Sequence, residues 1–453
     1  MELQSDNRPT LPDRKLERAW SMYDWANSVF PLSITTAIFP VYYEGVTKKA
    51  SIASGMATST DYYIEFLGHR FLNTALYSYS LSFAFLLIAL VQPLLSGIAD
   101  VKGRKKTFMQ FFCYMGATSS ASLYYFDTNH IWAGVLFFVL AMIGFAGSIV
   151  FYNAFLPEIT TEDRYDRVSA RGFAMGYFGS VLLLIVNLSL IILTEKPADG
   201  SDPAVTFISQ EMATRMAFVM VGLWWAGFAQ ITFRQLPKEN KLKKGGAITH
   251  GFSELKKVFT EIKNQPEISK YLRSFFFVSM GLQTIMYVAS LFGAKELNLP
   301  SIHLIGAVLV INLIGIPGSL FFSWLSGKIG NMLTLRILVV IWIFVCVIAY
   351  YIYTAAQFYL LGALVGTVMG GIQSLFRSTY AKLIPDDTPD HASYFSFYDV
   401  TEKLAIVFGT FAFGYIEEVT ESMRSSAVAL GLFFFIGLLL MIRIKNFKGV
   451  HAG

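Results

Sequence analysis

A short polar segment between two long apolar runs constrains this chain more than any other feature of its sequence. Residues 96–106 read SGIADVKGRKK, and the run on either side is long enough to cross a bilayer. Because a Gly-rich, charged turn cannot satisfy its backbone groups in hydrocarbon, this segment must be a tight loop at the membrane surface. A divergent copy, SWLSGKIGN at residues 323–331, again lies between apolar runs, with Gly330 placed 227 positions after Gly103. Two such loops half a chain apart predict a duplicated membrane protein and favour a transporter.

Composition supports a membrane protein and excludes several other classes. Of the 453 residues, 54% are hydrophobic and 15% are charged, whereas a soluble globular chain carries about 25% charged residues. Cys113 and Cys346 lie inside separate apolar runs, so we expect no disulfide or metal framework. The net charge of +5 comes from basic residues in loops, which fits membrane topology better than a nucleic-acid partner. Residues 1–18 are polar, and we expect no cleavable signal peptide.

The sequence holds no pattern typical of an enzyme. It contains neither a Gly-x-Ser-x-Gly nucleophile turn nor a Gly-x-x-x-x-Gly-Lys-Ser/Thr phosphate loop, and its six histidines are scattered. We therefore expect no enzymatic activity, no cofactor and no ATP-driven pumping. Gradient-driven or facilitated movement of a solute remains.

Twelve apolar runs of about 20 residues are each long enough to form a transmembrane helix. The first and the eleventh are the least apolar, because each holds polar residues that are costly in lipid. We therefore predict an all-α polytopic membrane protein. The predicted spans are residues 21–43, 74–98, 107–126, 131–155, 171–194, 214–235, 271–293, 302–326, 332–353, 358–381, 394–418 and 425–444.

Lys and Arg are unequally divided between the two sides that these spans define. The N-terminal segment, the second and fourth loops and the long central loop are rich in them, and the opposite side has few. Since basic loops tend to stay in the cytoplasm, both termini should be cytoplasmic, as an even number of spans requires. We expect a protein integral to the cytoplasmic membrane and surrounded by its lipid bilayer.

A second repeated landmark indicates two halves in the same orientation. Tyr152 precedes Pro157 by five residues, Tyr380 precedes Pro385 by five, and the two prolines lie 228 positions apart. This offset nearly equals that of the glycine loops, as expected for parallel six-span repeats about an axis normal to the membrane. The predicted parts are an N-terminal half, a cytoplasmic linker and a C-terminal half: residues 1–235, 236–270 and 271–453.

The linker has a helical pattern of its own. Phe252, Leu255, Phe259 and Ile262 recur at helical spacing among charged residues, which predicts an amphipathic helix on the inner leaflet. A tether between the halves is the simpler role for it, and a regulatory role is the alternative. The long external loop predicted at residues 44–73 carries no motif that points to a function.

The loop at residues 96–106 resembles the signature loop between spans two and three of the major facilitator superfamily, roughly G-x-L-A-D-R-x-G-R-K. Ser96 stands where the first Gly usually falls, and Lys102 partly replaces an early positive charge. The resemblance implies the major facilitator fold, with twelve transmembrane helices in two parallel six-helix repeats. It also implies a substrate site between the halves near mid-membrane, reached by alternating access.

Five further motifs narrow the resemblance. They are YDWANS, FYNAFLPE, RVSARGFAMGYFG, GGIQSLFRSTYAKLIP and YFSFYD. Together they resemble the bacterial relatives of the fungal vacuolar amino-acid effluxers linked to autophagy, over nearly the whole chain. This implies amino acids or similar zwitterions as cargo, moved outward. Span seven departs from many relatives, because Met280 precedes its Gly where they have Asp, so no coupling role is carried over to it.

The signature loop supplies the candidates for a cytoplasmic gate. In the superfamily its acid is thought to meet the N-terminal end of span eleven, and an exposed helix start attracts a carboxylate. Its basic residues could pair with acids across the cytoplasmic gap. The alternative is a charged loop that only sets topology. The candidate gate residues are Asp100, Gly103, Arg104 and Lys105.

Acids inside the spans are the candidates for ion coupling, because burying them in lipid is costly. Asp24 lies one helical turn from Asn27, and it could carry a proton, bind substrate or belong to a gate or structural pair. Asp399 and Glu402 of span eleven are the other candidates. Lys403 lies four residues after Asp399, so an ion pair within the helix is the alternative there.

Span ten offers a donor-rich face for a carboxylate, since Arg377 follows Gln373 by one turn. Glu402 or Lys403 could reach Arg377 or a charged substrate, and a purely structural pair for Arg377 is equally open. The other cavity candidates are single polar residues, which could instead hydrogen-bond a neighbouring helix. The predicted cavity set is Asn27, Tyr152, Asn153, Gln283, Tyr287, Asn312, Gln373, Arg377 and Lys403.

We therefore predict a monomeric carrier of a small solute, with protons as the candidate coupling ion. A drug or metabolite antiporter is the alternative within transport. Gly172, Gly176 and Gly179 of span five mildly favour it, although close helix packing explains them better. A membrane receptor or scaffold without transport is the alternative from another class, and the intact signature loop argues against it.

Overall fold

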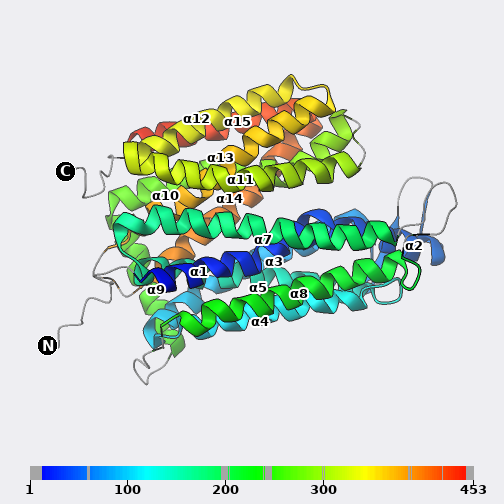
Figure 1. Ribbon diagram of the computed structural model, residues 1–453, viewed down its shortest axis with the longest axis horizontal. Helices are drawn as coiled ribbons and strands as arrows, with labels where there is room; N and C mark the ends of the chain where they lie inside the picture. The colour runs from blue at the N-terminus through cyan, green and yellow to red at the C-terminus, as the bar shows by residue number, and fades with distance from the viewer. Residues whose placement is uncertain are drawn as a thin grey trace.

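The computed structural model is almost entirely helical, and its long helices run side by side (Figure 1). It describes residues 13–58, 62–194, 203, 205–237, 239, 247–297, 299, 301–385, 388, 390–420 and 422–444. Within this part of the chain, nine helices are long and apolar enough to cross a membrane. These are α3 (Asn73–Lys102), α5 (Ile131–Ala154), α7 (Tyr165–Leu193), α8 (Gln210–Gln235), α10 (Pro266–Leu297), α11 (Ser301–Ile329), α12 (Asn331–Tyr350), α13 (Ala355–Leu383) and α15 (Met423–Ile442).

The three other predicted spans also fall on helices, but these are less apolar or interrupted, so the number twelve stays a prediction. The first span is interrupted at Pro31 and Pro40, each of which lacks the N–H that a continuous helix needs. The helices concerned are α1 (Arg14–Asn27), the π-helix η1 (Phe30–Ala37), α2 (Phe39–Ala53), α4 (Lys105–Ser122) and α14 (His391–Thr420).

The predicted external loop at residues 44–73 is only partly a loop. α2 continues to Ala53, and β1 (Tyr63–Phe66) pairs with β2 (His69–Leu72) as an antiparallel hairpin. The two residues of its turn, Leu67 and Gly68, have φ of 52° and 75°, the left-handed backbone that a two-residue hairpin turn requires.

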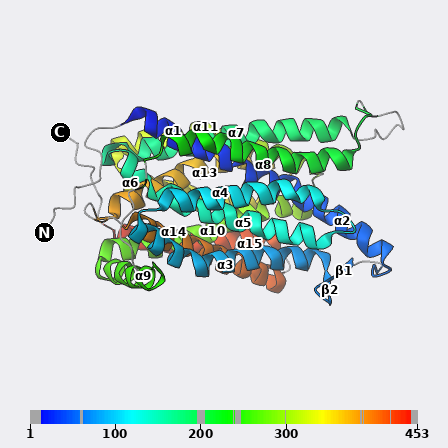
Figure 2. The ribbon, with the colours of Figure 1, turned by 90° about the horizontal axis from the view of Figure 1, so that it is seen from below.

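The long helices form two groups, which we call the N bundle (α1 to α8) and the C bundle (α10 to α15). Within the N bundle α4 packs on α5 and α8, and within the C bundle α11 packs on α13 while α15 packs on α10 and α12. Figure 1 shows the C bundle above the N bundle. Figure 2 shows α9 (Ala247–Asn264) at one end of the molecule and the hairpin at the other, which we call the linker end and the hairpin end.

The helix expected in the linker is present as α9. Val258 and Ile262 are buried, whereas Phe259, which we placed on the same apolar face as Ile262, is exposed. The side chains of Phe252 and Leu255 lie outside the described residues. α9 packs against α3 of the N bundle and also contacts α14 of the C bundle, so it spans both bundles at the linker end.

Glycines allow the helices next to the cavity to approach closely. A Cβ at Gly176 of α7 would lie 2.5 Å from Ser28 Oγ, and one at Gly179 would lie 2.8 Å from the Trp25 carbonyl oxygen. Gly370 of α13 would similarly meet the Gly315 carbonyl oxygen at 2.7 Å. Helix packing therefore accounts for these three glycines, and for Gly176 and Gly179 of span five this agrees with our expectation.

Candidate functional site

A cavity of about 400 Å³ lies between the two bundles. Its walls are mainly apolar and aromatic, with Phe30 and Phe145 contributed by the N bundle and Phe275 and Phe376 by the C bundle. Charged side chains reach it at two places, namely a pair between Asp24 and Arg377 and a cluster on α14. A largely apolar cavity with a few convergent polar groups is typical of small-molecule sites.

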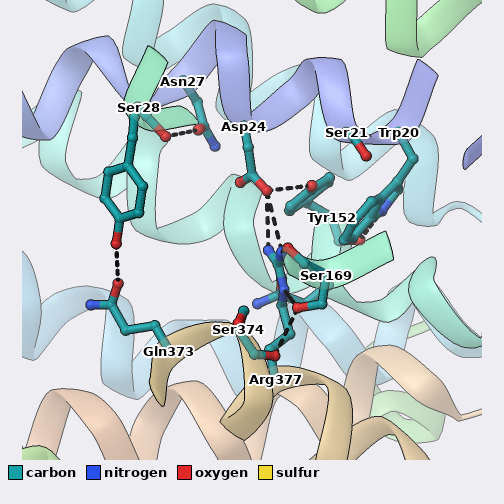
Figure 3. A network of polar contacts seen from close by, with 12 residues as sticks. Trp20, Ser21, Asp24, Asn27, Ser28, Tyr152, Ser169, Gln373, Ser374 and Arg377 are labelled. Atoms are coloured by element: carbon teal, nitrogen blue, oxygen red, sulfur yellow. Dashed lines mark hydrogen bonds and ion pairs between the residues drawn. The ribbon is translucent and has the colours of Figure 1, made fainter. Parts of the chain in front are cut away.

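Arg377 of α13 reaches across the gap between the bundles to Asp24 of α1 (Figure 3). Its Nη1 and Nη2 each donate to Asp24 Oδ2 at 3.3 Å. Nε and Nη2 donate to the hydroxyl and carbonyl oxygens of Ser169 of α7, both at 2.8 Å. Both charged side chains are buried, and such charges persist only when they are paired and hydrogen-bonded. The pair therefore joins the N bundle to the C bundle.

Aromatic side chains surround this ion pair. The guanidinium carbon of Arg377 lies 4.9 Å from the ring centre of Trp20 and 4.3 Å from that of Phe173, within cation–π range. Tyr152 Oη donates to Asp24 Oδ2 at 2.7 Å while its ring stacks on Trp20 at 4.2 Å. Tyr152 is thus fully buried behind Asp24 and does not line the cavity, contrary to our prediction, because its ring is held by aromatic stacking.

Three predicted amide side chains do line the cavity beside Arg377. Asn153 Oδ1 accepts a 3.4 Å hydrogen bond from Arg377 Nη1, and Gln373 Oε1 accepts a 3.1 Å bond from Tyr177 Oη of the other bundle. Asn27 is buried, and its Nδ2 has no hydrogen-bond partner among the described residues. A buried donor of this kind beside a cavity is suited to an acceptor oxygen of a ligand.

The α14 cluster consists of Asp399, Glu402 and Lys403, all of which line the cavity. Lys403 Nζ lies 2.9 Å from Asp399 Oδ1 and 3.3 Å from Glu402 Oε2. Glu402 Oε1 accepts a 2.8 Å hydrogen bond from Gln283 Nε2 of α10. The ion pair within the helix is therefore present. The reach of Glu402 or Lys403 to Arg377 that we considered is not found, because that guanidinium is already paired across the bundles.

The last two predicted cavity residues also line the cavity, but in the described part of the chain we find no hydrogen bond from them to its charged groups. Tyr287 of α10 is partly exposed there. Asn312 Nδ2 of α11 donates to the Val308 carbonyl oxygen of its own helix at 2.8 Å. Of the predicted cavity set, only Tyr152 does not line the cavity.

At the linker end, Asp100 of α3 meets the start of α14, as the signature loop predicts. Its Oδ2 accepts from the Ser393 N–H at 2.7 Å, and its Oδ1 accepts from the Ala392 N–H at 3.2 Å. Gly103 ends α3 with φ of 60°, a left-handed cap that glycine adopts without strain. The loop thus turns sharply enough to leave the carboxylate against α14.

The two ion pairs found for Lys105 lie within the N bundle, and pairing of the loop's basic residues across the gap stays a prediction. Lys105 Nζ lies 2.6 Å from Glu158 Oε1 and 3.2 Å from Asp100 Oδ1, both acids of its own bundle. The short helix α6 (Leu156–Ile159) brings Glu158 to this position. Arg104 is exposed at the start of α4, and we find no acid within ion-pair distance of it in the described part of the chain.

Glu158 also contacts the C bundle, so it connects Lys105 and Asp100 of the N bundle to α14. Our sequence reasoning missed this role. Its Oε1 lies 3.1 Å from Nδ1 of His391, the first residue of α14. Burial alone would raise the pKa of Glu158, but the Lys105 ammonium and the His391 ring lower it to about 2. The acid follows Pro157 in FYNAFLPE, so the motif was visible while its partners were not.

The divergent second loop makes a related contact, in which the loop supplies the hydrogen-bond donors and the helix start supplies the acid. It contains no acid, and Ser326 and Asn331 donate to Asp166 at the start of α7, at 3.1 and 2.7 Å. Lys382 Nζ at the end of α13 lies 2.8 Å from the same carboxylate. No pattern in the sequence pointed to this network, because the copied loop lacks the acid by which such loops are recognised.

Comparisons with known sequences identify relatives of this chain. The family model described as "Vacuole effluxer Atg22 like" matches residues 12–452. An uncharacterized MFS-type transporter, YxiO of Bacillus subtilis, is 31% identical over 429 residues, which cover 94% of each chain. Autophagy-related protein 22 of Kluyveromyces lactis is 22% identical, with 99% of this chain and 96% of the relative covered.

Solved structures show the same fold at low identity. The human organic anion transporter MFSD10 superposes with a TM-score of 0.71 at 12% identity, covering 95% of this chain and 99% of that one. The major facilitator transporter FucP in its outward conformation gives 0.67 at 12% identity, covering 95% and 98%. These two chains establish the architecture, and the sequence relatives establish the family.

Proposed function

Because this chain belongs to the Atg22-like family of major facilitator transporters, we propose that it exports small zwitterionic solutes of the amino-acid class by alternating access. The protein is an integral membrane protein, and members of this superfamily are transporters rather than enzymes. The effluxer description of its family supports outward movement. From its distribution of basic residues we propose that it lies in the cytoplasmic membrane with the linker end in the cytoplasm.

We further propose that the N and C bundles are two six-helix halves, which makes twelve transmembrane helices. The two related contacts at the linker end support this repeat. Asp100 of the second span meets the start of α14, and Asp166 at the start of α7 meets the copied loop at Ser326 and Asn331. Each loop thus contacts the matching helix of the other half, as parallel repeats require.

The distribution of contacts between the bundles supports a state closed at the linker end. The hydrogen bonds between bundles that we find in the described ranges lie at the linker end or beside the cavity, and we find none there at the hairpin end. We propose that opening toward the cytoplasm requires these bonds to break. The movement of two halves relative to each other usually depends on an interface that has two discrete arrangements.

The polar groups of the cavity suit the two charges of a zwitterion. The unpartnered Nδ2 of Asn27 is a donor for a carboxylate, and Arg377, whose own donors bond Asp24, Asn153 and Ser169, lines the same cavity. Glu402 is an acceptor for an ammonium group, while the apolar walls accommodate an aliphatic or aromatic side chain. The observation that carries the proposal is this single cavity, which both bundles line and which presents charges of both signs.

Counterflow in proteoliposomes tests the proposal. Vesicles loaded with an unlabelled amino acid should take up the same labelled amino acid, for at least one member of a complete panel. Asn27→Ala should weaken this exchange about tenfold, since one hydrogen bond to a charged group contributes roughly 1.5 kcal/mol. Asn129→Ala, in an exposed turn remote from the cavity, is the matched control.

The other outcomes of this experiment separate the rival functions. Folded protein that exchanges no amino acid contradicts the proposal. Exchange of lipophilic drugs or other metabolites in its place would identify the alternative antiporter. Ligand binding without any flux would identify a receptor or scaffold.

A further inference from the structure

The geometry points to proton exchange at the α14 cluster, where one proton and the ammonium group of the cargo are alternative occupants of Asp399 and Glu402. This inference deepens the proposed function and rests on it for the identity of the cargo. It assigns the coupling ion, the coupling site and the sense of coupling, namely protons inward and cargo outward. Asp24, our other candidate for coupling, takes no part.

The charges that line the cavity do not cancel. Asp24 is balanced by Arg377, whose two Nη atoms lie 3.3 Å from its carboxylate. The α14 cluster holds two carboxylates and one ammonium, so it carries one net negative charge. An unbalanced charge at this depth is costly in a medium of low dielectric constant. The cluster is therefore a site for one monovalent cation, and the Asp24–Arg377 pair is not.

Unsatisfied polar atoms at the cluster point the same way. Asp399 is 2% exposed, and its Oδ2 has no hydrogen-bond partner in the described chain. Gln92 of α3 is fully buried, and neither atom of its side-chain amide is hydrogen-bonded there. The amide of Gln92 nonetheless lies within interaction range of Asp399, across the contact between the two bundles. Because buried polar atoms are almost always hydrogen-bonded, these unsatisfied atoms indicate a site for a bound ion or ligand.

The position of the cluster connects its occupancy to the gate. Gln92 precedes Asp100 by eight residues, and Asp399 follows His391 by eight, so both lie about 12 Å from the linker-end contact. The same two helices, α3 and α14, thus form the gate contact at the linker end and also hold Gln92 and Asp399 at the cluster. A cation bound between Gln92 and Asp399 therefore affects the contact between α3 and α14, which must break when the two halves move apart at the linker end.

The coordination at the cluster favours a proton over a metal cation. The ammonium of Lys403 already occupies the space between the two carboxylates, at 2.9 and 3.3 Å from their oxygens. A metal cation would need several oxygen ligands and would be repelled by that ammonium. A proton needs one carboxylate oxygen, and an ammonium group of the cargo needs one exposed carboxylate such as Glu402.

In the described part of the chain, we find no other titratable group near the cluster that would bind the proton in place of Asp399 and Glu402. α5 contains no charged residue, and Arg424, the one charged residue of α15, pairs with Glu296 at 3.0 Å. Glu261 of α9 accepts from Tyr394 at the linker end. The remaining groups that interact with the cluster in the described chain are two tyrosines, which ordinarily titrate near pH 10, and two amides. They are Tyr287, Tyr398, Gln92 and Gln283.

Because the proton and the ammonium group of the cargo cannot occupy the cluster together, the carrier exchanges one for the other. With cargo bound, the ammonium faces Glu402 and the site binds no proton; after release of the cargo outside, one proton takes its place for the return. A zwitterion carries no net charge, so each cycle moves one positive charge inward. The proton gradient and the membrane potential would both drive export.

Proton release on cargo binding tests the sense of coupling. Purified protein in weakly buffered detergent, with a pH indicator, should release about one proton per amino acid bound, where the amino acid is one that gives counterflow. Glu402→Gln and Asp399→Asn should abolish this release. Glu211→Gln, at the hairpin end in a 3.9 Å pair with Lys49, should release protons as the wild type does. Binding without release, or with proton uptake, would overturn the inference.

A second readout needs no cargo and separates failure of this inference from failure of the proposed function. Spin labels at Arg18→Cys and Lys328→Cys, exposed positions at the linker end of the two bundles, report the fraction of closed molecules. This fraction should change as the pH is lowered in the wild type, and it should be insensitive to pH in Asp399→Asn and Glu402→Gln.

His391→Gln controls for the titratable ring at the gate and should keep the pH response. A wild type without pH response, or a response lost in His391→Gln and kept in Glu402→Gln, would overturn the inference. If no amino acid binds while Glu402→Gln still abolishes the pH response, the proton site stands and the proposed cargo is wrong.

Discussion

The carboxylate of Asp100 accepts a 2.7 Å hydrogen bond from the backbone N–H of Ser393, in the first turn of α14. The contact joins α3 of the N bundle to the C bundle at the linker end. The first turn of a helix exposes unpaired N–H groups and a partial positive charge, so an ionised carboxylate stabilises the contact more than a neutral group of the same shape.

Neutralising this carboxylate should weaken the gate without removing it. Asp100→Asn is expected to lower the ratio of closed to open molecules by about 5- to 30-fold, or about 1–2 kcal/mol. Distances between spin labels on the two bundles measure this ratio. Asp163→Asn, at an exposed acid of the same end of the N bundle, is the matched control. Equal ratios in wild type and Asp100→Asn would show that the loop only sets topology.

Removing one partner of the Asp24–Arg377 pair should be more costly. Arg377→Gln leaves a buried carboxylate without its counter-charge, which is expected to cost about 3–5 kcal/mol in stability. Asp24→Asn with Arg377→Gln should recover part of this loss, because neither charge then remains unpaired. Thermal unfolding in detergent provides the comparison. A double variant that is as unstable as the two single losses added together would show that the two side chains act independently.

The space beside the same pair can be tested with a single methyl group. A Cβ at Gly172 of α7 would collide with the Asp24 carboxylate and lie 2.9 Å from Arg377 Nη2. Gly172→Ala should therefore displace the pair and cost about 1–3 kcal/mol. Gly227→Ala of α8 is the control, because its Cβ meets nothing within 4 Å while the change in helix propensity is shared. Equal stabilities of the two variants would contradict the packing described for α1 and α7.

The Glu158 contact predicts a specific pH dependence. Its pKa falls from 4.5 to about 2 in the folded protein, so its contribution to stability is fully present above about pH 4.5 and is lost as the pH falls toward 2. The stability difference between wild type and Glu158→Gln should therefore be constant from pH 8 to about 5 and shrink in more acidic solution. Unfolding measured across this range checks it, and a difference that grows on acidification would contradict the assignment.

The signature loop shows how far the sequence could lead. Its glycine and charge predict the turn at Gly103, because that turn depends on local backbone geometry. The contact of Asp100 with the eleventh span is implied by the resemblance to the major facilitator superfamily, and the attraction of a helix start for a carboxylate supports it. The pairing of Lys105 could not be predicted in the same way. It depends on Glu158 being carried by α6 to within 2.6 Å, and on His391 facing the same acid from the other bundle.

The cavity shows the same division between local pattern and tertiary contact. Polar residues inside apolar spans are few, so most of the predicted set does line the cavity. Tyr152 does not, since the stacking on Trp20 that removes it from the surface joins residues 132 positions apart. The pairing of Arg377 with Asp24 joins residues 353 positions apart, and no spacing within either helix encodes it.

Distances measured at both ends of the molecule test alternating access most directly. One pair of spin labels at Arg18→Cys and Lys328→Cys reports the linker end, and a second pair at Ile192→Cys and Tyr351→Cys reports the hairpin end, all at exposed positions. In lipid with an amino acid that gives counterflow, a second population should appear in which the linker end is wider and the hairpin end narrower. A single closed population at the linker end in every condition, while counterflow proceeds, would contradict this account.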